Sequence, residues 1–204
     1  MCWSAEVSLQ TFVLGCIGLA ILYALSYSNF KIVIILSFIS VQLWEYFIWK
    51  YIDRPDISRI FSFIIYVTIL SQPIIAILAT NYKYLIKYYI FLMIVNFLIF
   101  ASFSDPKFDF RPKVANDGHL DWNWFDNDTL GITGSLIYLA FFLGIMLITK
   151  NYSAFVFASI LYIYSVYNYS KNKTTSSMWC WFANVCIILC IIDALYIKVS
   201  AHKF

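Results

Sequence analysis

Charged residues are scarce in this chain. Only 12% of its 204 residues are Asp, Glu, Lys or Arg, whereas about a quarter is usual for a soluble domain. No two Lys or Arg residues are adjacent, and the formal net charge is only +3. Because a nucleic-acid partner calls for a dense basic patch, nucleic-acid binding is not expected.

Neither a cleavable leader nor a disulfide framework is expected. The opening residues MCWSAEVS carry no Lys or Arg before the first apolar run, so we expect the first span to be retained as its own insertion signal. Five cysteines are an odd number, and three of them lie in apolar stretches, where Cys acts as a small hydrophobe: Cys16, Cys186 and Cys190. Only Cys2 and Cys180 flank a boundary, and they could form a disulfide if their face is extracytoplasmic.

Apolar residues make up 62% of the chain and aromatic residues 21%, which predicts an integral multi-pass membrane protein with lipid as its surroundings. A bilayer span needs about 20 mainly apolar residues. Seven segments qualify: 8–28, 32–52, 58–80, 84–104, 130–149, 152–170 and 177–198. The sequence therefore predicts one all-α domain over residues 1–204, a bundle of about seven transmembrane helices with one long capping loop, 105–128.

Seven spans would put the two ends of the chain on opposite faces, called here the N-terminal face and the C-terminal face. All seven tryptophans and ten of the eleven acidic residues fall on or just under the N-terminal face. The exception, Asp193, is expected to be a separate feature that pairs with Lys198. Basic residues number eight on the N-terminal face and six on the other, so they orient the chain only weakly. The acidic loop favours an external N-terminus and loop, with the C-terminus in the cytoplasm.

Polar side chains inside the spans are functional candidates, because they are costly in lipid. Glu45 follows Gln42 by three residues, so both share one helical face. With Gln72, Asn96 and Asn184 they are expected to line an acidic vestibule on the N-terminal face that binds or conducts a small molecule or a cation. The expected aromatic wall of this vestibule consists of Trp3, Trp44, Trp122, Trp179 and Trp181.

Each of these residues has a simpler explanation. Glu45 could reach the interface or pair with Lys50. Gln72 could satisfy the backbone carbonyl that Pro73 leaves without a donor. The two asparagines could form hydrogen bonds between helices, and the tryptophans could form an ordinary interfacial belt.

The long loop is rich in aromatic and acidic residues, as in GHLDWNWFDND, and rings of this kind seek burial against a bundle. We therefore expect the loop to cap the N-terminal face. His119 and Asp121 could form an acid–base pair or supply metal ligands. No second histidine is near, so the sequence predicts neither a metal site nor a cofactor, and a hydrogen-bonded surface role for His119 is equally open.

Three classes of function follow from these observations. The first is the binding or conducting membrane protein already described. The second is a structural or assembly protein of a membrane or virion, for which an aromatic face would serve as an interface and a homo-oligomer would be compatible. The third is an intramembrane enzyme that uses Cys2 or His119. A retinal protein is not expected, because no lysine lies midway along the seventh span.

Five short motifs resemble an uncharacterised family of small multi-pass membrane proteins that begin Met-Cys-Trp-Ser: MCWSAEVS, QLWEYFIW, QP, GHLDW and SSMWCW. The resemblance would span nearly the whole chain, and it implies a hydrophobic helical bundle with no assigned reaction. Bacterial members carry loop cysteines that are missing here, so a loop disulfide is in doubt for this chain. By position the resemblance marks Cys2, Trp3, Ser4, Glu45, Gln72, Pro73, His119 and Trp122.

Overall fold

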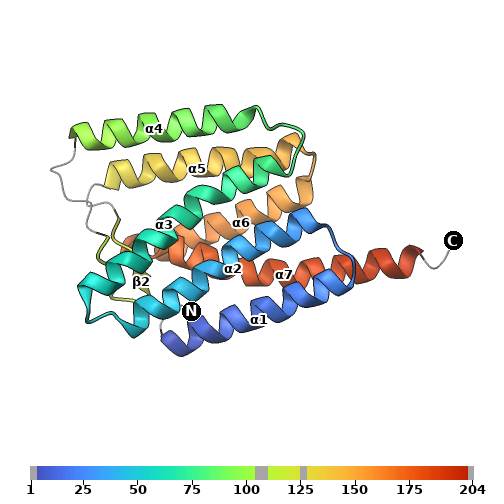
Figure 1. The fold of residues 1–204 in the computed structure, drawn as a ribbon, viewed down its shortest axis with the longest axis horizontal. Helices are drawn as coiled ribbons and strands as arrows, with labels where there is room; N and C mark the ends of the chain where they lie inside the picture. The colour runs from blue at the N-terminus through green and yellow to red at the C-terminus, as the bar shows by residue number, and fades with distance from the viewer. Residues whose placement is uncertain (1–3, 104–109, 125–127, 202–204) are drawn as a thin grey trace.

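The computed structural model describes residues 4–103, 110–124 and 128–201, and over these ranges the chain forms seven α-helices and one short hairpin (Figure 1). The helices are α1 Ala5–Ala24, α2 Asn29–Lys50, α3 Pro55–Leu78, α4 Leu85–Phe103, α5 Asp128–Ile148, α6 Tyr152–Tyr169 and α7 Thr175–Ala201. The hairpin strands are β1 Lys113–Val114 and β2 Leu120–Asp121, and a 3-10 turn, η1 Ser170–Asn172, precedes α7. The predicted all-α class with seven helices is confirmed.

Five of the helices are long and apolar enough to cross a membrane: α1, α2 over Lys31–Lys50, α3, α5 over Gly131–Ile148 and α7 over Thr175–Ser200. Helix α4 contributes a shorter apolar segment, Leu85–Ile99. Large apolar side chains also cover the outside of the bundle, such as Leu14, Ile163 and Tyr167. The lengths and the apolar exterior fit a multi-pass membrane protein.

Local backbone signals set several helix ends. Ser4 is the N-cap of α1 and accepts a hydrogen bond from the Val7 backbone N–H at 3.2 Å. Helix α1 ends at Ala24 rather than near residue 28, because the chain turns at Ser26, whose φ is 56°. Pro55 occupies the first turn of α3, where a missing N–H costs nothing, whereas Pro73 lies inside the same helix.

Five helices form a closed ring. Helix α2 packs against α3, α3 against α5, α5 against α6, α6 against α7, and α7 returns to α2. The helices run side by side along the long axis of the molecule, with the N-terminal face on the left of Figure 1 and the C-terminal face on the right. This ring positions the candidate site described below.

The two remaining helices lie outside the ring. Helix α1 packs on α2 and α7, and α4 packs on α3 and α5. The approach of α1 is close, because a Cβ added at Gly15 would lie 2.8 Å from Ile39 Cγ1, and one added at Gly18 would overlap Ile187. On the α4 side, the Tyr89 hydroxyl donates to the Leu70 carbonyl at 3.1 Å.

Candidate functional site: a cavity at the C-terminal face

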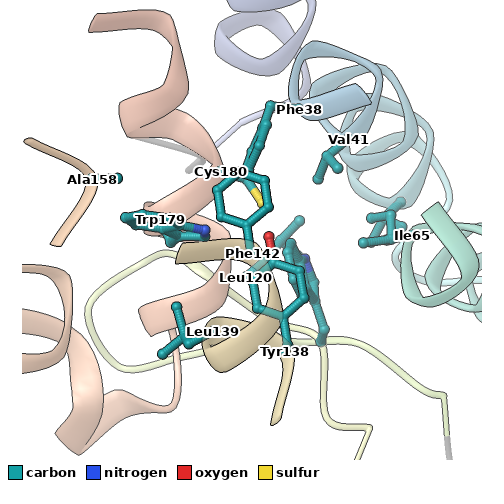
Figure 2. Packing of buried hydrophobic residues seen from close by; sticks show 12 residues of the cluster. Phe38, Val41, Ile65, Leu120, Tyr138, Leu139, Phe142, Ala158, Trp179 and Cys180 are labelled. Carbon is teal, nitrogen blue, oxygen red and sulfur yellow. The ribbon is translucent and has the colours of Figure 1, made fainter. Parts of the chain in front are cut away.

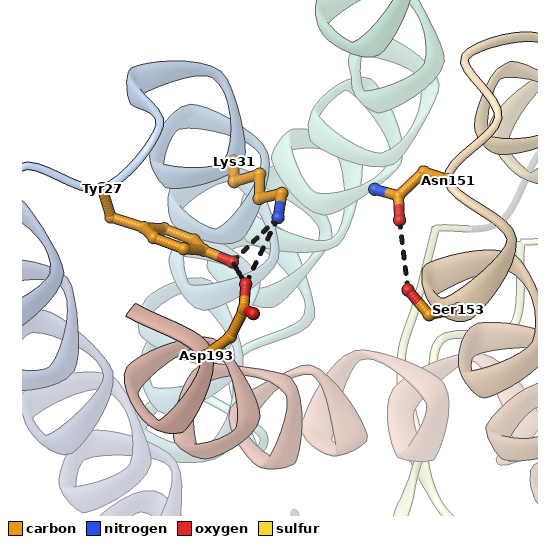
Figure 3. A network of polar contacts seen from close by, with 5 residues as sticks. All are labelled: Tyr27, Lys31, Asn151, Ser153 and Asp193. Carbon is orange, nitrogen blue, oxygen red and sulfur yellow. Dashed lines mark hydrogen bonds and ion pairs between the residues drawn. The ribbon is translucent and has the colours of Figure 1, made fainter. Parts of the chain in front are cut away.

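A polar network joins the start of α2 to the end of α7 at the C-terminal face (Figure 3). The Tyr27 hydroxyl donates to Asp193 Oδ2 at 2.7 Å, and Lys31 Nζ donates to the Tyr27 hydroxyl at 2.8 Å. Lys31 Nζ also lies 3.7 Å from Asp193 Oδ2, and both side chains are partly exposed, at 37% and 49%. The prediction that Asp193 pairs with Lys198 was wrong. Lys31 on α2 reaches Asp193 instead, because α2 packs against α7.

A cavity of about 500 Å³ opens beside this network. Its lining comes from all five ring helices, α2, α3, α5, α6 and α7. Asn151 and Ser153 lie across the mouth from Tyr27, Lys31 and Asp193 (Figure 3). From Lys31 to Phe38, the deepest lining residue of α2, the helix rises about 10 Å at 1.5 Å per residue. The cavity thus enters the ring from the C-terminal face.

Aromatic side chains close the inner end of the cavity. Phe38 contacts Phe142 edge to face with ring centroids 5.3 Å apart, and Trp179 in the same way at 6.3 Å. The ring of Tyr162 packs edge to face on Trp179, with ring centroids 5.4 Å apart. Phe38, Phe142 and Trp179 line the cavity and belong to the main hydrophobic core (Figure 2). We call these three residues the aromatic floor.

Glu45 lies under the loop hairpin at the opposite end of the ring. Its carboxylate oxygen Oε1 accepts hydrogen bonds from Trp122 Nε1 at 3.1 Å and from the Ser177 hydroxyl at 2.6 Å. Glu45 has 0% exposure, so the interpretation that it reaches the interface is wrong. Lys50 instead lies over the rings of Tyr46 and Tyr51.

The described part of the loop, 110–124, packs against the N-terminal end of the bundle. Strands β1 and β2 pair Val114 with Leu120, which is fully buried. Trp122 stacks on Trp124 with centroids 4.7 Å apart, and Trp124 Nε1 donates to the Ser62 hydroxyl at 3.0 Å. The hairpin and the two tryptophans that follow it are therefore fixed to α2 and α3 over the N-terminal end of the ring.

Asp117 anchors the tip of the hairpin to the segment before α7. Its carboxylate accepts hydrogen bonds from Asn172 Nδ2 and the Thr174 hydroxyl, both at 2.9 Å, and from the His119 backbone N–H at 3.1 Å. Burial acts to raise the pKa of Asp117, but these three hydrogen bonds outweigh it and lower the pKa. His119 is buried against Tyr169 with centroids 5.4 Å apart, and burial lowers the pKa of its imidazole.

The two residues proposed as an acid–base pair have local contacts. His119 packs on Tyr169, and Asp121 Oδ1 accepts from the Asn123 backbone N–H at 2.8 Å. Neither residue lines the cavity. Cys2, the other catalytic candidate, lies outside the described residues.

The polar residues predicted to share one vestibule lie in different places. Gln42 is buried on the same helix as Glu45. Gln72 accepts from the Tyr138 hydroxyl at 2.6 Å and donates to the Ser37 carbonyl at 3.4 Å, so it links α3 to α5 and α2. Asn96 lies beside Gly134 between α4 and α5, and Asn184 donates to the Trp181 carbonyl of its own helix at 3.0 Å. None of these five residues lines the cavity.

The tryptophans predicted to form one aromatic wall also lie in different places. Trp179 is its one described member that lines the cavity. Trp44 stacks on Phe61 at 6.3 Å, and Trp181 packs edge to face on Phe182 at 5.5 Å. Trp3 lies outside the described residues, as does Cys2. Cys180 is a buried free thiol, and its disulfide with Cys2 stays a prediction.

Sequence reasoning did not select Tyr27, Lys31, Asn151 or Ser153 as site residues. Tyr27 and Lys31 are spaced by four residues, a signal that the sequence did carry. Asp193 lies 166 residues after Tyr27 in the chain. It contacts Tyr27 and Lys31 because α2 packs against α7. Comparison of the chain with known protein families, curated proteins and solved structures finds no match. Membership of the family that begins Met-Cys-Trp-Ser therefore stays a prediction from the motifs.

Proposed function

We propose that this protein is a multi-pass membrane protein, with all seven helices across the bilayer, that binds a small molecule in the cavity inside the five-helix ring. The observation that carries the proposal is the cavity itself. At about 500 Å³, it falls within the range of pockets for small ligands. Its lining is mainly apolar with a few polar groups at the mouth, as ligand sites usually are.

Binding is favoured over conduction because the cavity is blind. A conducting path would need polar groups from the C-terminal face to Glu45. Instead the aromatic floor and the core beyond it separate the mouth from the Glu45 carboxylate, which is fully buried and capped by Trp122. Conduction of a cation through the N-terminal face would require the hairpin and the floor to move.

Two native cysteines test this proposal. Cys186 and Cys190 line the cavity from α7, and Cys190 lies one helical turn deeper than Asp193. Cys180 is 1% exposed in the core and is the internal control. The full chain is reconstituted into lipid vesicles, treated with a membrane-impermeant thiol reagent from either side, and mapped by peptide mass spectrometry.

We expect Cys190 to react faster than Cys186, to react only from the side that carries the C-terminus, and to react at least a hundredfold faster than Cys180. Labelling of Cys190 from both sides, or cation flux above that of empty vesicles, would contradict the blind cavity and favour conduction. An assembly protein needs no open cavity, so the absence of Cys190 labelling from either side favours that alternative.

A further inference from the structure

The chemistry of the cavity changes sharply with depth. Among the described residues that line it, Lys31 and Asp193 are the two that carry a charge, and both stand at the mouth. Below them the walls are formed by side chains such as Ile35, Ala158 and Leu161, down to the aromatic floor. An occupant must therefore place an apolar body in the ring and its polar atoms at the mouth.

The mouth is already neutral. Lys31 and Asp193 compensate each other's charge through the ion pair and through Tyr27. A ligand head with a net charge would leave one charge without compensation at the edge of an apolar cavity, which is costly. On the facing side, the Asn151 amide and the Ser153 hydroxyl lie 3.4 Å apart and offer uncharged donors and acceptors, with the amide nitrogen directed toward Lys31 in Figure 3.

The size of the cavity limits the apolar body. A volume of about 500 Å³ lies in the lower half of the usual range for small-molecule pockets, about 300–1,000 Å³. A short unbranched chain fits both this volume and a depth of about 10 Å along α2. Because bilayer lipid is as apolar as the cavity walls, transfer of the chain from the bilayer gives little net gain, and the head must supply the selectivity.

We infer that the cavity binds a single-chain amphiphile with an uncharged, hydrogen-bonding head, of the monoacylglycerol class, with the head among Lys31, Asp193 and Asn151 and the chain on the aromatic floor. This inference rests on the proposed function and names its ligand class. Three probes test it, with the same brominated acyl chain and different heads: a glycerol ester, a sulfonate and a trimethylammonium group. Bromine quenches tryptophan fluorescence on contact, so Trp179 reports a chain that reaches the floor.

The measurement uses the full chain in phosphatidylcholine nanodiscs. The Trp179 signal is the difference in quenching between the wild type and Trp179→Phe. Ala154→Phe fills the cavity near its mouth, and Ala20→Phe is the matched control, because Ala20 is exposed on α1 and does not line the cavity. Thermal unfolding of each variant shows that it is folded.

We expect saturable quenching of Trp179 by the glycerol probe, abolished by Ala154→Phe and kept in Ala20→Phe, with at least tenfold weaker binding of both charged probes. The mouth charges supply a second readout. Asp193→Asn removes the carboxylate that compensates the charge of Lys31, so it should raise the affinity for the sulfonate probe at least fivefold. Lys31→Gln should raise the affinity for the trimethylammonium probe at least fivefold. A purely structural role for this pair would not produce opposite shifts.

The uncharged-head inference would be overturned if the three probes bound equally well. It would also be overturned if Asp193→Asn and Lys31→Gln left the order of the three binding strengths unchanged. In either case the cavity would remain a ligand site. Absence of Ala154-dependent quenching by any probe, with Cys190 still open to the aqueous reagent, would overturn the amphiphile class alone. Absence of both signals would overturn the proposed function as well.

Discussion

The hydrogen bond from Trp122 to Glu45 is predicted to hold the loop hairpin on the N-terminal end of the ring. Trp122→Phe keeps an aromatic ring on the stack with Trp124 but removes the N–H that Glu45 Oε1 accepts at 3.1 Å. Because Glu45 has 0% exposure, water cannot replace the lost donor. A buried polar group that loses a partner costs about 1–3 kcal/mol, so we expect a loss of that size in the free energy of unfolding.

Trp124→Phe is the matched control. It removes the same kind of donor, but from the neutral hydroxyl of Ser62 at 3.0 Å, where a hydrogen bond contributes about 0.5–1.5 kcal/mol. Ser177→Ala removes the second donor to the same Glu45 oxygen. The double variant Trp122→Phe with Ser177→Ala should therefore be non-additive, because both single changes act on one carboxylate.

The assay combines unfolding of the full chain in mixed micelles with limited trypsin digestion. Lys113 is exposed on β1, so faster cleavage after Lys113 reports release of the hairpin. Trp122→Phe should accelerate this cleavage more than Trp124→Phe does. Equal unfolding free energies and equal cleavage rates for wild type and Trp122→Phe would refute the argument that this hydrogen bond holds the hairpin.

Two further predictions concern packing and pH. Gly18→Ala should lower the midpoint of thermal unfolding, because the added Cβ would overlap Ile187. Gly144→Ala, which has open space around it, should raise the free energy of unfolding by about 0.5–1 kcal/mol. If Gly18→Ala were instead the more stable of the two variants, the close packing of α1 would be contradicted. Because burial lowers the pKa of His119 in the fold, its contribution to stability is complete above the unfolded pKa near 6.5 and is lost as the pH falls toward the folded pKa. The drop in unfolding midpoint between pH 8 and pH 5 should be smaller in His119→Gln than in the wild type, and an equal drop would refute the assignment.

The bundle could be predicted from the sequence, because seven apolar segments are separated by short polar turns and one long loop. The end of α1 could not be predicted, since the residue with left-handed φ after it is Ser26, where a glycine would have signalled the turn. Glu45 was expected to line a vestibule, whereas in the structure it is fully buried and accepts a hydrogen bond from Trp122 of the loop.

The location of the cavity was not predictable in the same way. The concentration of tryptophan and acidic residues directed attention to the N-terminal face, but Trp122 and Trp124 fill space there through stacking and hydrogen bonds. The cavity results from how five helices close a ring, and its mouth depends on the contact of Lys31 with Asp193 from opposite ends of the chain. Helical periodicity places residues on faces but does not give these distances between helices.

We propose above that a small molecule occupies the cavity open at the C-terminal face. Native mass spectrometry of the full-length protein, released directly from its membrane, tests this most directly. We expect a bound species of a few hundred daltons on the wild type and on Ala20→Phe, and its loss from Ala154→Phe. A wild-type protein that carries no bound species, or a species retained equally by Ala154→Phe, would contradict the claim.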